Sequence, residues 1–458
     1  MHFHDAGTER QDPNSYLIGP RQAWFTYAMT IALMVFDYVD RQVIVTLFPH
    51  LKAEWGLSDT QLGGLVSIVS VTVAVFGIPV ALIADRFSRV KSVFVMALIW
   101  SMATISCMLA GSYTHLFAAR ALVGLGEAGY GSVGTAMIAS HFPQRMRAAL
   151  LGGFFASASV GSVLGVVLGG VIATNWGWQA AFGVVGIPGL LLALLYLLVR
   201  DYRTVEFASE PGLKRRNAVQ GAHQIARAIF RPKTMLWVCL GAAAQLIVVS
   251  TIWAWLPSYL NRVHGMAPDQ AALKSALVVL AGALGSVVWG AVVDRAGRKK
   301  LTGKLFAMAV LCPASMVALI FAFAAPHWGI ATNTNAQLAL IVLGGFLATC
   351  TVGPVAAVVI NVIHPAVRST GASVLSLFQN LLGLATGPLL AGAVSDVWGL
   401  ETAMIAMPGF CILASVMFLL AARTYEHDVR SVREQTAGQI LARKFPKIEE
   451  IGGLGEAV

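Results

Sequence analysis

Twelve apolar stretches follow one another along the 458-residue chain, separated by short polar segments. They cover residues 22–48, 60–84, 92–112, 115–140, 147–173, 179–199, 235–260, 273–293, 303–324, 336–363, 369–395 and 402–422. Each is long enough to cross about 30 Å of hydrocarbon as a helix rising about 1.5 Å per residue. The pattern therefore predicts an all-α integral membrane protein with twelve transmembrane helices.

The overall composition agrees with this class of protein. Hydrophobic residues make up 57% of the chain and charged residues 12%, whereas soluble domains carry about 25% charged residues. The five cysteines fall within or at the ends of apolar stretches without CxxC spacing, so we expect neither a disulfide framework nor a metal site. The sequence has no phosphate-binding loop ending in Gly-Lys-Ser or Gly-Lys-Thr, which argues against ATP-driven chemistry and a bound cofactor.

The net charge of +10 reflects membrane topology rather than nucleic-acid binding. With both termini on one side, 27 of the 32 Lys and Arg residues fall on that side, and only Lys52, Arg262 and Lys274 fall on the other. Basic residues accumulate on the cytoplasmic side of membrane proteins. Both termini are therefore predicted to be cytoplasmic, and we expect a multi-pass protein of a bacterial inner (plasma) membrane.

The chain is organised as two similar halves. The turn ALIADRFSRVK, with Asp85, Arg86 and Arg89, resembles a second turn 209 residues later, GAVVDRAGRKK. The second turn supplies the residues Gly290, Asp294, Arg295, Gly297 and Arg298. We expect these cytoplasmic turns to act as a latch that holds one conformation, because their charged side chains can bind helix ends. The predicted domains are a tail (1–21), a six-helix bundle (22–199), a linker (200–234), a second bundle (235–422) and a tail (423–458).

Glycines recur at helical spacing in corresponding stretches of both halves. The fifth stretch contains Gly161, Gly165 and Gly169, and the eleventh contains Gly383 and Gly387. Such stripes let helix backbones approach closely. They suit a moving seam between the halves, and they suit static packing equally.

Ionisable residues interrupt the apolar pattern of the first half at two places. Asp37, Asp40 and Arg41 share one helical face in the first stretch, and Arg120 and Glu127 lie two turns apart on one face of the fourth. A charge at the bilayer centre costs about 2.5 to 3.5 kcal/mol even on the mildest scale. These residues are therefore expected to face protein or a water-filled cavity, either as a structural ion pair or as a site in a transport path.

The expected chemistry differs between acids and bases in this set. Burial favours the protonated form of a carboxyl group and a nearby arginine favours its ionised form, so Asp40 and Glu127 are candidates for proton coupling. Arg41 and Arg120 keep their charge and suit an anionic group of a substrate, or a gating contact, with Asp37 beside them. The second half offers the amides Gln245, Asn361, Gln379 and Asn380 as candidate binding residues.

The motif at Gly290 to Lys300 resembles the signature turn of the major facilitator superfamily, although Ala81 and Ser88 depart from it in the first copy. The segments DYVDRQ, RALVGLGEAGYG and WLPSYLNRVHG are most similar to the spinster branch. The pattern of Asp40, Arg41, Arg120 and Glu127 also resembles organic anion:proton symporters of the anion:cation symporter family. The resemblance implies the same proton-coupling and anion-binding roles.

The sequence thus predicts a monomeric secondary transporter working by alternating access, with protons and a small molecule or lipid as its partners. The expected cargo is an organic anion or an anionic or zwitterionic amphiphile, such as a lysolipid or sphingolipid-like molecule. Symport of small carboxylates such as sugar acids is the alternative, and a non-transporting receptor on the same scaffold is another. No Ser/His/Asp set converges in the sequence pattern, so an enzyme is not expected.

Overall fold

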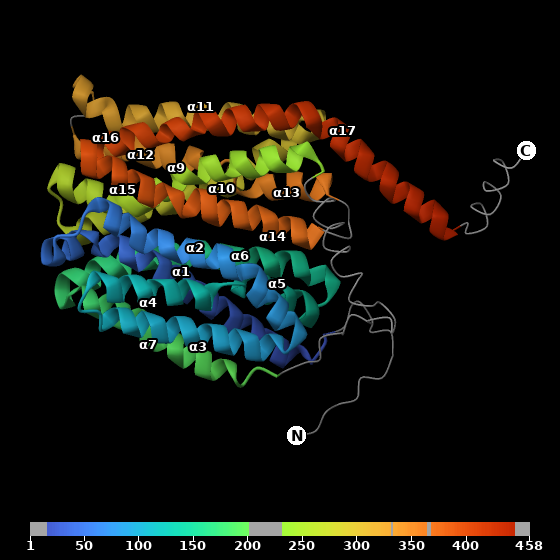
Figure 1. Ribbon diagram of the computed structural model, residues 1–458, viewed down its shortest axis with the longest axis horizontal. Coiled ribbons are helices and arrows are strands. Elements are labelled where there is room, and N and C mark those ends of the chain that lie inside the picture. The colour runs from blue at the N-terminus through green and yellow to red at the C-terminus, as the bar shows by residue number, and fades with distance from the viewer. Residues whose placement is uncertain (1–15, 201–230, 331–332, 364–367, 445–458) are drawn as a thin grey trace, which may run out of the picture. The chain divides into compact units, whose positions relative to one another are not determined.

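A computed structural model describes residues 16–200, 231–330, 333–363 and 368–444, and every regular element in these ranges is a helix. Contacts divide the chain into unit 1 (Met1–Phe207 and Pro257–Val279) and unit 2 (Ala208–Leu256 and Leu280–Val458). Figure 1 shows the helices of both units. Most of the predicted linker, 201–230, lies outside the described residues.

The helices of the first half follow each other with short connections. They are α1 (Pro20–Trp55), α2 (Asp59–Arg86), α3 (Arg89–Met108), α4 (Tyr113–Glu127), α5 (Tyr130–His141), α6 (Gln144–Trp176) and α7 (Trp178–Tyr196). Within this half, α6 packs along α1, and α3 packs against both α4 and α7.

The second half contains longer helices and several interrupted ones. They are α9 (Lys233–His264), α10 (Pro268–Lys299), α11 (Gly303–Ala324), η1 (Ala325–Trp328), α12 (Thr334–Ala348), α13 (Val352–Val362), α14 (Arg368–Phe378), η3 (Gln379–Leu384), α15 (Thr386–Trp398), α16 (Leu400–Ala406), η4 (Met407–Gly409) and α17 (Phe410–Lys444). Figure 1 shows α17 continuing well past the ends of the helices beside it, α11 among them.

The all-helical membrane architecture predicted from the sequence is confirmed. Each of the twelve apolar stretches coincides with one helix or with consecutive helices, and ten helical segments in the described ranges have the length and composition to cross a membrane. The fourth stretch is divided into α4 and α5, of 15 and 12 residues. The first stretch, α1, carries three ionisable side chains in its middle, which lowers its hydropathy.

The glycine stripes pack helices together inside each half. A Cβ on Gly165 of α6 would lie 2.6 Å from the carbonyl oxygen of Val39 in α1. In the second half, a Cβ on Gly383 of η3 would lie 2.8 Å from the Leu246 Cβ of α9. The near neighbours of Gly161, Gly165 and Gly169 all belong to α1, so these three glycines pack α6 closely against α1 within the first half.

Candidate functional site

The charged residues predicted from the sequence converge in unit 1, between the middle of α1 and the length of α4. All five are described, and four of them have side chains no more than 5% exposed. They form two separate groups that we call the sealed pair, Asp40 with Arg120, and the Arg41 cluster, Asp37 with Arg41 and Glu127.

The sealed pair is enclosed by four helices. Arg120 Nη1 lies 3.0 Å from Asp40 Oδ2 and 3.3 Å from the Asp40 carbonyl oxygen, and its Nε lies 3.5 Å from the carbonyl oxygen of Leu65 in α2. Thr104 of α3 donates to Asp40 Oδ1 at 3.0 Å. Both charged side chains are 1% exposed. Every oxygen of the Asp40 carboxylate is therefore occupied, and the Arg120 guanidinium faces protein.

The Arg41 cluster is more open and contains two acids for one base. Arg41 Nε lies 3.1 Å from Asp37 Oδ1 one turn earlier on α1, and Arg41 Nη2 lies 2.8 Å from Glu127 Oε2. The carboxyl groups of Asp37 and Glu127 therefore contact the same guanidinium group. Arg41 has 19% of its side chain exposed, whereas Glu127 is fully buried. The Arg41 guanidinium also lies 5.5 Å from the ring centre of Tyr38.

The two charged residues of α4, Arg120 and Glu127, therefore have their ionic partners on α1 rather than on their own helix. Arg120 and Glu127 share a helical face, as the sequence predicted, but they belong to different groups. Asp40 and Arg41 are neighbours in sequence and also belong to different groups. Sequence reasoning missed Thr104, because a threonine in an apolar stretch more commonly bonds back to its own helix; it does so here as well, to Trp100 O at 2.9 Å.

Two features of the sequence GLGEAGYG position Glu127. A Cβ on Gly126 would lie 2.5 Å from the backbone nitrogen of Trp100, so this glycine lets α4 press against α3. Gly129 has a φ of 84°, a left-handed conformation that glycine adopts without strain, and α4 ends at Glu127. The helix break places the Glu127 carboxyl group beside α1, and Tyr130 at the start of α5 donates to the Thr30 carbonyl at 2.6 Å.

The amides of the second half do not come together with one another. Gln245 is fully buried in unit 2 and donates to the Ala348 carbonyl at 2.9 Å and to Ser315 Oγ at 3.3 Å. Asn361 donates to the Tyr425 hydroxyl at 3.3 Å near the end of α13. Gln379 and Asn380 begin η3, a π-helical turn that the sequence pattern did not reveal; such turns are frequent at functional sites.

The described latch residues make their contacts within their own half of the chain. Lys304 Nζ lies 2.6 Å from Asp294 Oδ1, and a Cβ on Gly297 would lie 2.5 Å from the Lys304 side chain. Arg89 Nη1 lies 3.4 Å from Ser140 Oγ at the end of α5. Gly290 has open space around it, and Arg295 and Arg298 are exposed. The side chains of Asp85 and Arg86 are outside the described part of the chain.

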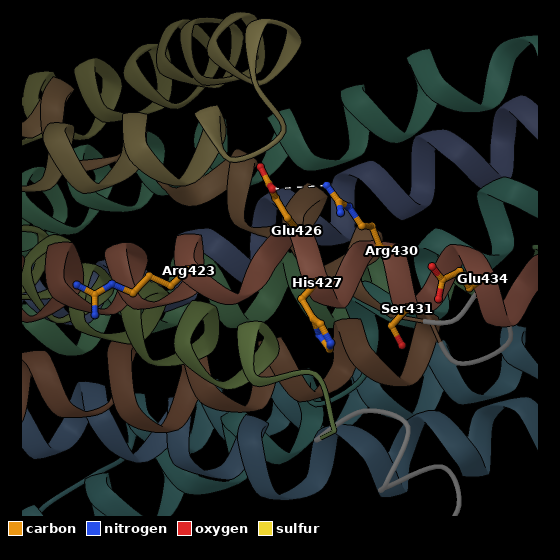
Figure 2. A pocket seen from close by; sticks show the side chains of 6 residues that line it. All are labelled: Arg423, Glu426, His427, Arg430, Ser431 and Glu434. Carbon is orange, nitrogen blue, oxygen red and sulfur yellow. Dashed lines mark ion pairs between the residues drawn. The ribbon is translucent and has the colours of Figure 1, made fainter.

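A polar recess lies along the C-terminal extension of α17 (Figure 2). Its lining residues are Arg423, Glu426, His427, Arg430, Ser431 and Glu434. All six come from one helix, and Arg430 Nη2 lies 3.9 Å from Glu426 Oε2. Basic and acidic side chains balance, so the recess has no strong preference for a ligand of either charge.

Two sets of consecutive apolar helices, the first with charged residues paired inside it, are the architecture of a membrane transporter. The sequence profile of the Major Facilitator Superfamily matches residues 30–384 and 238–451, so the chain belongs to this superfamily. It is therefore a secondary transporter of the membrane and not an enzyme.

Comparison with individual relatives places the chain more precisely within the superfamily. Protein spinster homolog 3 of Homo sapiens is 27% identical over 412 residues, which cover 84% of this chain and 78% of the relative. The hexuronate transporter of Bacillus subtilis is 24% identical over 393 residues, covering 85% and 92%. The crystal structure of a bacterial homologue of the human lysosomal transporter Spinster has a TM-score of 0.78 at 23% identity, covering 90% of this chain and 99% of that chain. The chain is thus a spinster-like member of the superfamily.

Proposed function

We propose that the protein is a proton-coupled transporter that moves an organic anion, or an anionic or zwitterionic amphiphile, by alternating access. Two six-helix bundles, joined by the linker at 200–234, would move against each other around a site in the membrane. The observation that carries this proposal is the imbalance of charge around Arg41.

The two groups together contain three carboxyl groups and two guanidinium groups. With all five ionised, one negative charge is left without a basic partner in a buried site, and uncompensated buried charge is costly. Binding one proton removes that charge. This supports proton coupling, with one proton as the simplest stoichiometry.

Glu127 is the proton-coupling residue that the contacts support best. Its carboxyl group and that of Asp37 contact one guanidinium group, and two carboxyl groups held at one buried site repel each other unless one of them binds a proton. Asp40, the second candidate, has both oxygens occupied by Arg120 and Thr104. We propose that Asp40 acts later in the cycle, when the sealed pair separates.

Arg41 is the proposed contact for the anionic group of the substrate. It is the partly exposed arginine of the set, and a guanidinium can bind a carboxylate, phosphate or sulfate in two-point fashion. An anion that binds Arg41 competes with Glu127, which favours protonation of that acid. Arg120 is proposed to act in gating rather than in binding, because its guanidinium is sealed by protein.

Similarity to spinster proteins favours an amphiphile such as a lysolipid as cargo. Similarity to a hexuronate transporter favours a small carboxylate, which Arg41 would bind equally well. Gln245, Asn361, Gln379 and Asn380 remain candidate contacts from the second half, and the buried position of Gln245 supports a packing role instead. The two cytoplasmic turns are proposed to limit opening toward the cytoplasm.

Uptake into proteoliposomes with an imposed pH gradient tests both parts of the proposal. The panel pairs lysophospholipids and a sphingoid phosphate with hexuronates and simple carboxylates. We expect one class to accumulate with the gradient and not after its collapse by a protonophore. Binding of a panel member without any accumulation would favour the non-transporting receptor, and equal accumulation without a gradient would contradict proton coupling.

A further inference from the structure

The hydroxyl group of Thr104 in α3 lies within hydrogen-bonding distance of two acceptors. Its Oγ1 is 3.0 Å from Asp40 Oδ1 in α1 and 2.9 Å from the carbonyl oxygen of Trp100, one turn earlier in α3. A threonine hydroxyl carries one hydrogen, so it donates fully to one acceptor at a time, and its oxygen can also accept. The buried Thr104 hydroxyl can therefore turn between the carboxylate and the carbonyl oxygen of its own helix.

The two oxygens of the Asp40 carboxyl group have chemically different neighbours. Oδ2 lies 3.0 Å from Arg120 Nη1, and a guanidinium group has donors only and keeps its charge. A hydrogen on Oδ2 would therefore compete with an N–H donor. Oδ1 faces the Thr104 hydroxyl, which can donate or accept. A proton bound by Asp40 thus belongs on Oδ1.

We propose that Thr104 is a positioning residue that lets Asp40 bind and release its proton on Oδ1. In the proposed function, on which this role in transport rests, Asp40 is the second proton-coupling residue. When the carboxylate is ionised, Thr104 donates to Oδ1. When Oδ1 binds a proton, its O–H group donates to Thr104 Oγ1, and the Thr104 hydroxyl donates to the Trp100 carbonyl. One proton is gained or lost at Oδ1, and the hydroxyl keeps its own hydrogen throughout.

The turning hydroxyl matters because the sealed pair is closed off from solvent. The side chains of Asp40 and Arg120 are each 1% exposed, and Thr104 is equally buried. A buried polar group that loses its partner cannot replace it with bulk water, and the loss is costly. With Thr104 in place, Oδ1 has a hydrogen-bond partner in both protonation states. A side chain without a hydroxyl would leave the protonated carboxyl group without an acceptor.

The second acceptor, the Trp100 carbonyl, belongs to a residue that other helices hold in place. A Cβ on Gly126 of α4 would lie 2.5 Å from the Trp100 backbone nitrogen. The Trp100 ring packs edge-on against the Tyr130 ring of α5, with 5.4 Å between the ring centres. The backbone around this carbonyl is therefore fixed by packing that does not involve the sealed pair.

Other titratable and charged groups surround Asp40, but within the described ranges none of them bonds to Oδ1. Those that interact with it electrostatically are Arg120, Asp37, Arg41, Glu127 and Cys107. The helices α2, α6 and α7 contribute no titratable side chain within 60–84, 148–176 and 178–195. Of the two in α5, Tyr130 bonds to Thr30 and His141 to its own helix. Thr104 is therefore the residue whose replacement tests Oδ1 separately.

Infrared difference spectra of the full-length protein in lipid vesicles detect a protonated carboxyl group without cargo or a proton gradient. We expect acidification to produce the carbonyl-stretching band of a protonated acid. Asp40→Asn should remove the part of this band that belongs to Asp40, and Asp40→Glu should displace it. In Thr104→Val this part should move to higher frequency, because the protonated carboxyl group makes one hydrogen bond fewer. Thr104→Ser keeps the hydroxyl and should restore the parent frequency.

Uptake into proteoliposomes gives a second readout. Thr104→Val should slow accumulation driven by a pH gradient about tenfold, because an unsatisfied buried polar group costs at least that much. Substrate exchange needs no net deprotonation and should be retained. Thr26→Val is the matched control, because Thr26 is buried and donates to the Gln22 carbonyl oxygen at 2.9 Å but bonds to no carboxyl group within the described residues. It should change neither the band nor uptake.

An unshifted Asp40 band in folded Thr104→Val would overturn the proposal, because Thr104 would then only pack against its neighbours. If no acid-induced band responds to Asp40→Asn or Asp40→Glu, Asp40 holds no exchangeable proton and the proposal is equally wrong. Should Thr104→Val fail to fold, Thr104→Cys takes its place. A thiol is a weak hydrogen-bonding group, so the band should again move to higher frequency, and an unshifted band would contradict the proposal.

The two readouts separate failure of this proposal from failure of the proposed function. A shifted band together with uptake that ignores the pH gradient would contradict proton coupling and leave the hydrogen-bonding role of Thr104 standing. Gradient-driven uptake together with an unshifted band would retain the proposed function and remove the role of Thr104.

Discussion

At the scale of single residues, Arg41 and Arg120 carry the same charge but lie in different surroundings and make different contacts. Arg120 is 1% exposed and donates hydrogen bonds to Asp40 and to backbone oxygens. Arg41 is 19% exposed and is shared by two acids. The sequence predicted that these residues would face the protein interior. It could not assign the pairs, because the partners lie on different helices and the contacts depend on how α1 and α4 pack.

The first prediction concerns Glu127. Glu127→Gln imitates permanent protonation, so gradient-driven accumulation should be lost while substrate exchange across the membrane survives, since exchange needs no net deprotonation. Uptake and counterflow are measured side by side on protein shown to be folded. Asp37→Asn is the matched variant, because it alters the other acid of the Arg41 cluster. A folded Glu127→Gln protein that still concentrates substrate with a pH gradient would place the proton site elsewhere.

The second prediction concerns Arg120. Arg120→Ala leaves the buried Asp40 carboxylate without its cation and should destabilise the protein by about 3–5 kcal/mol. Arg41→Ala should cost less, because the Arg41 side chain is 19% exposed, so its two acidic partners lie nearer to solvent than Asp40 does. Thermal unfolding in detergent measures both. Equal losses of stability would show that Arg120 is not sealed as described.

At the scale of helices, the periodic pattern predicted where elements exist but not where they break. All twelve apolar stretches coincide with helices, because length and hydropathy alone decide which segments can span hydrocarbon. The break after Glu127 depends on Gly129, whereas other glycines, such as Gly165, lie inside an intact helix. The π-turn from Gln379 has no periodic signal at all, since one inserted residue barely changes an apolar pattern.

The third prediction tests the close approach that the sequence GLGEAGYG allows. Gly126→Ala should destabilise the protein by about 1–3 kcal/mol, because its Cβ would be pressed against the Trp100 backbone. Gly131→Ala, five residues later, is the control: it has open space within 4 Å, and alanine favours helix. Melting temperatures of the two variants are compared in one detergent. An unchanged melting temperature of the Gly126→Ala protein would mean that α3 and α4 are less closely packed than described.

At the scale of the whole molecule, charge distribution orients the chain and leaves the two ends of the helices chemically different. In the proposed topology the cytoplasmic side holds 27 basic residues, so no single ion pair there stands out from the sequence. The opposite side holds three, and two of them meet at Asp59. The sequence alone did not predict this meeting, since Asp59 and Arg262 are 203 residues apart. The contact between Asp59 and Arg262 depends on the fold, which places the start of α2 beside the last turn of α9.

The last prediction tests this orientation with a matched pair of exposed histidines. His327, in η1 between α11 and α12, has 54% of its side chain exposed and lies on the outer side in the proposed topology; His427 of α17 is 87% exposed and lies on the cytoplasmic side. In intact cells, a membrane-impermeant maleimide should label His327→Cys and leave His427→Cys unlabelled until the membrane is permeabilised. The native cysteines are buried, so the parent protein gives the background. Because both sites are accessible in the folded protein, the membrane is the barrier that separates them. The reverse pattern would invert the topology and place Lys52, Asp59 and Arg262 at the cytoplasmic end.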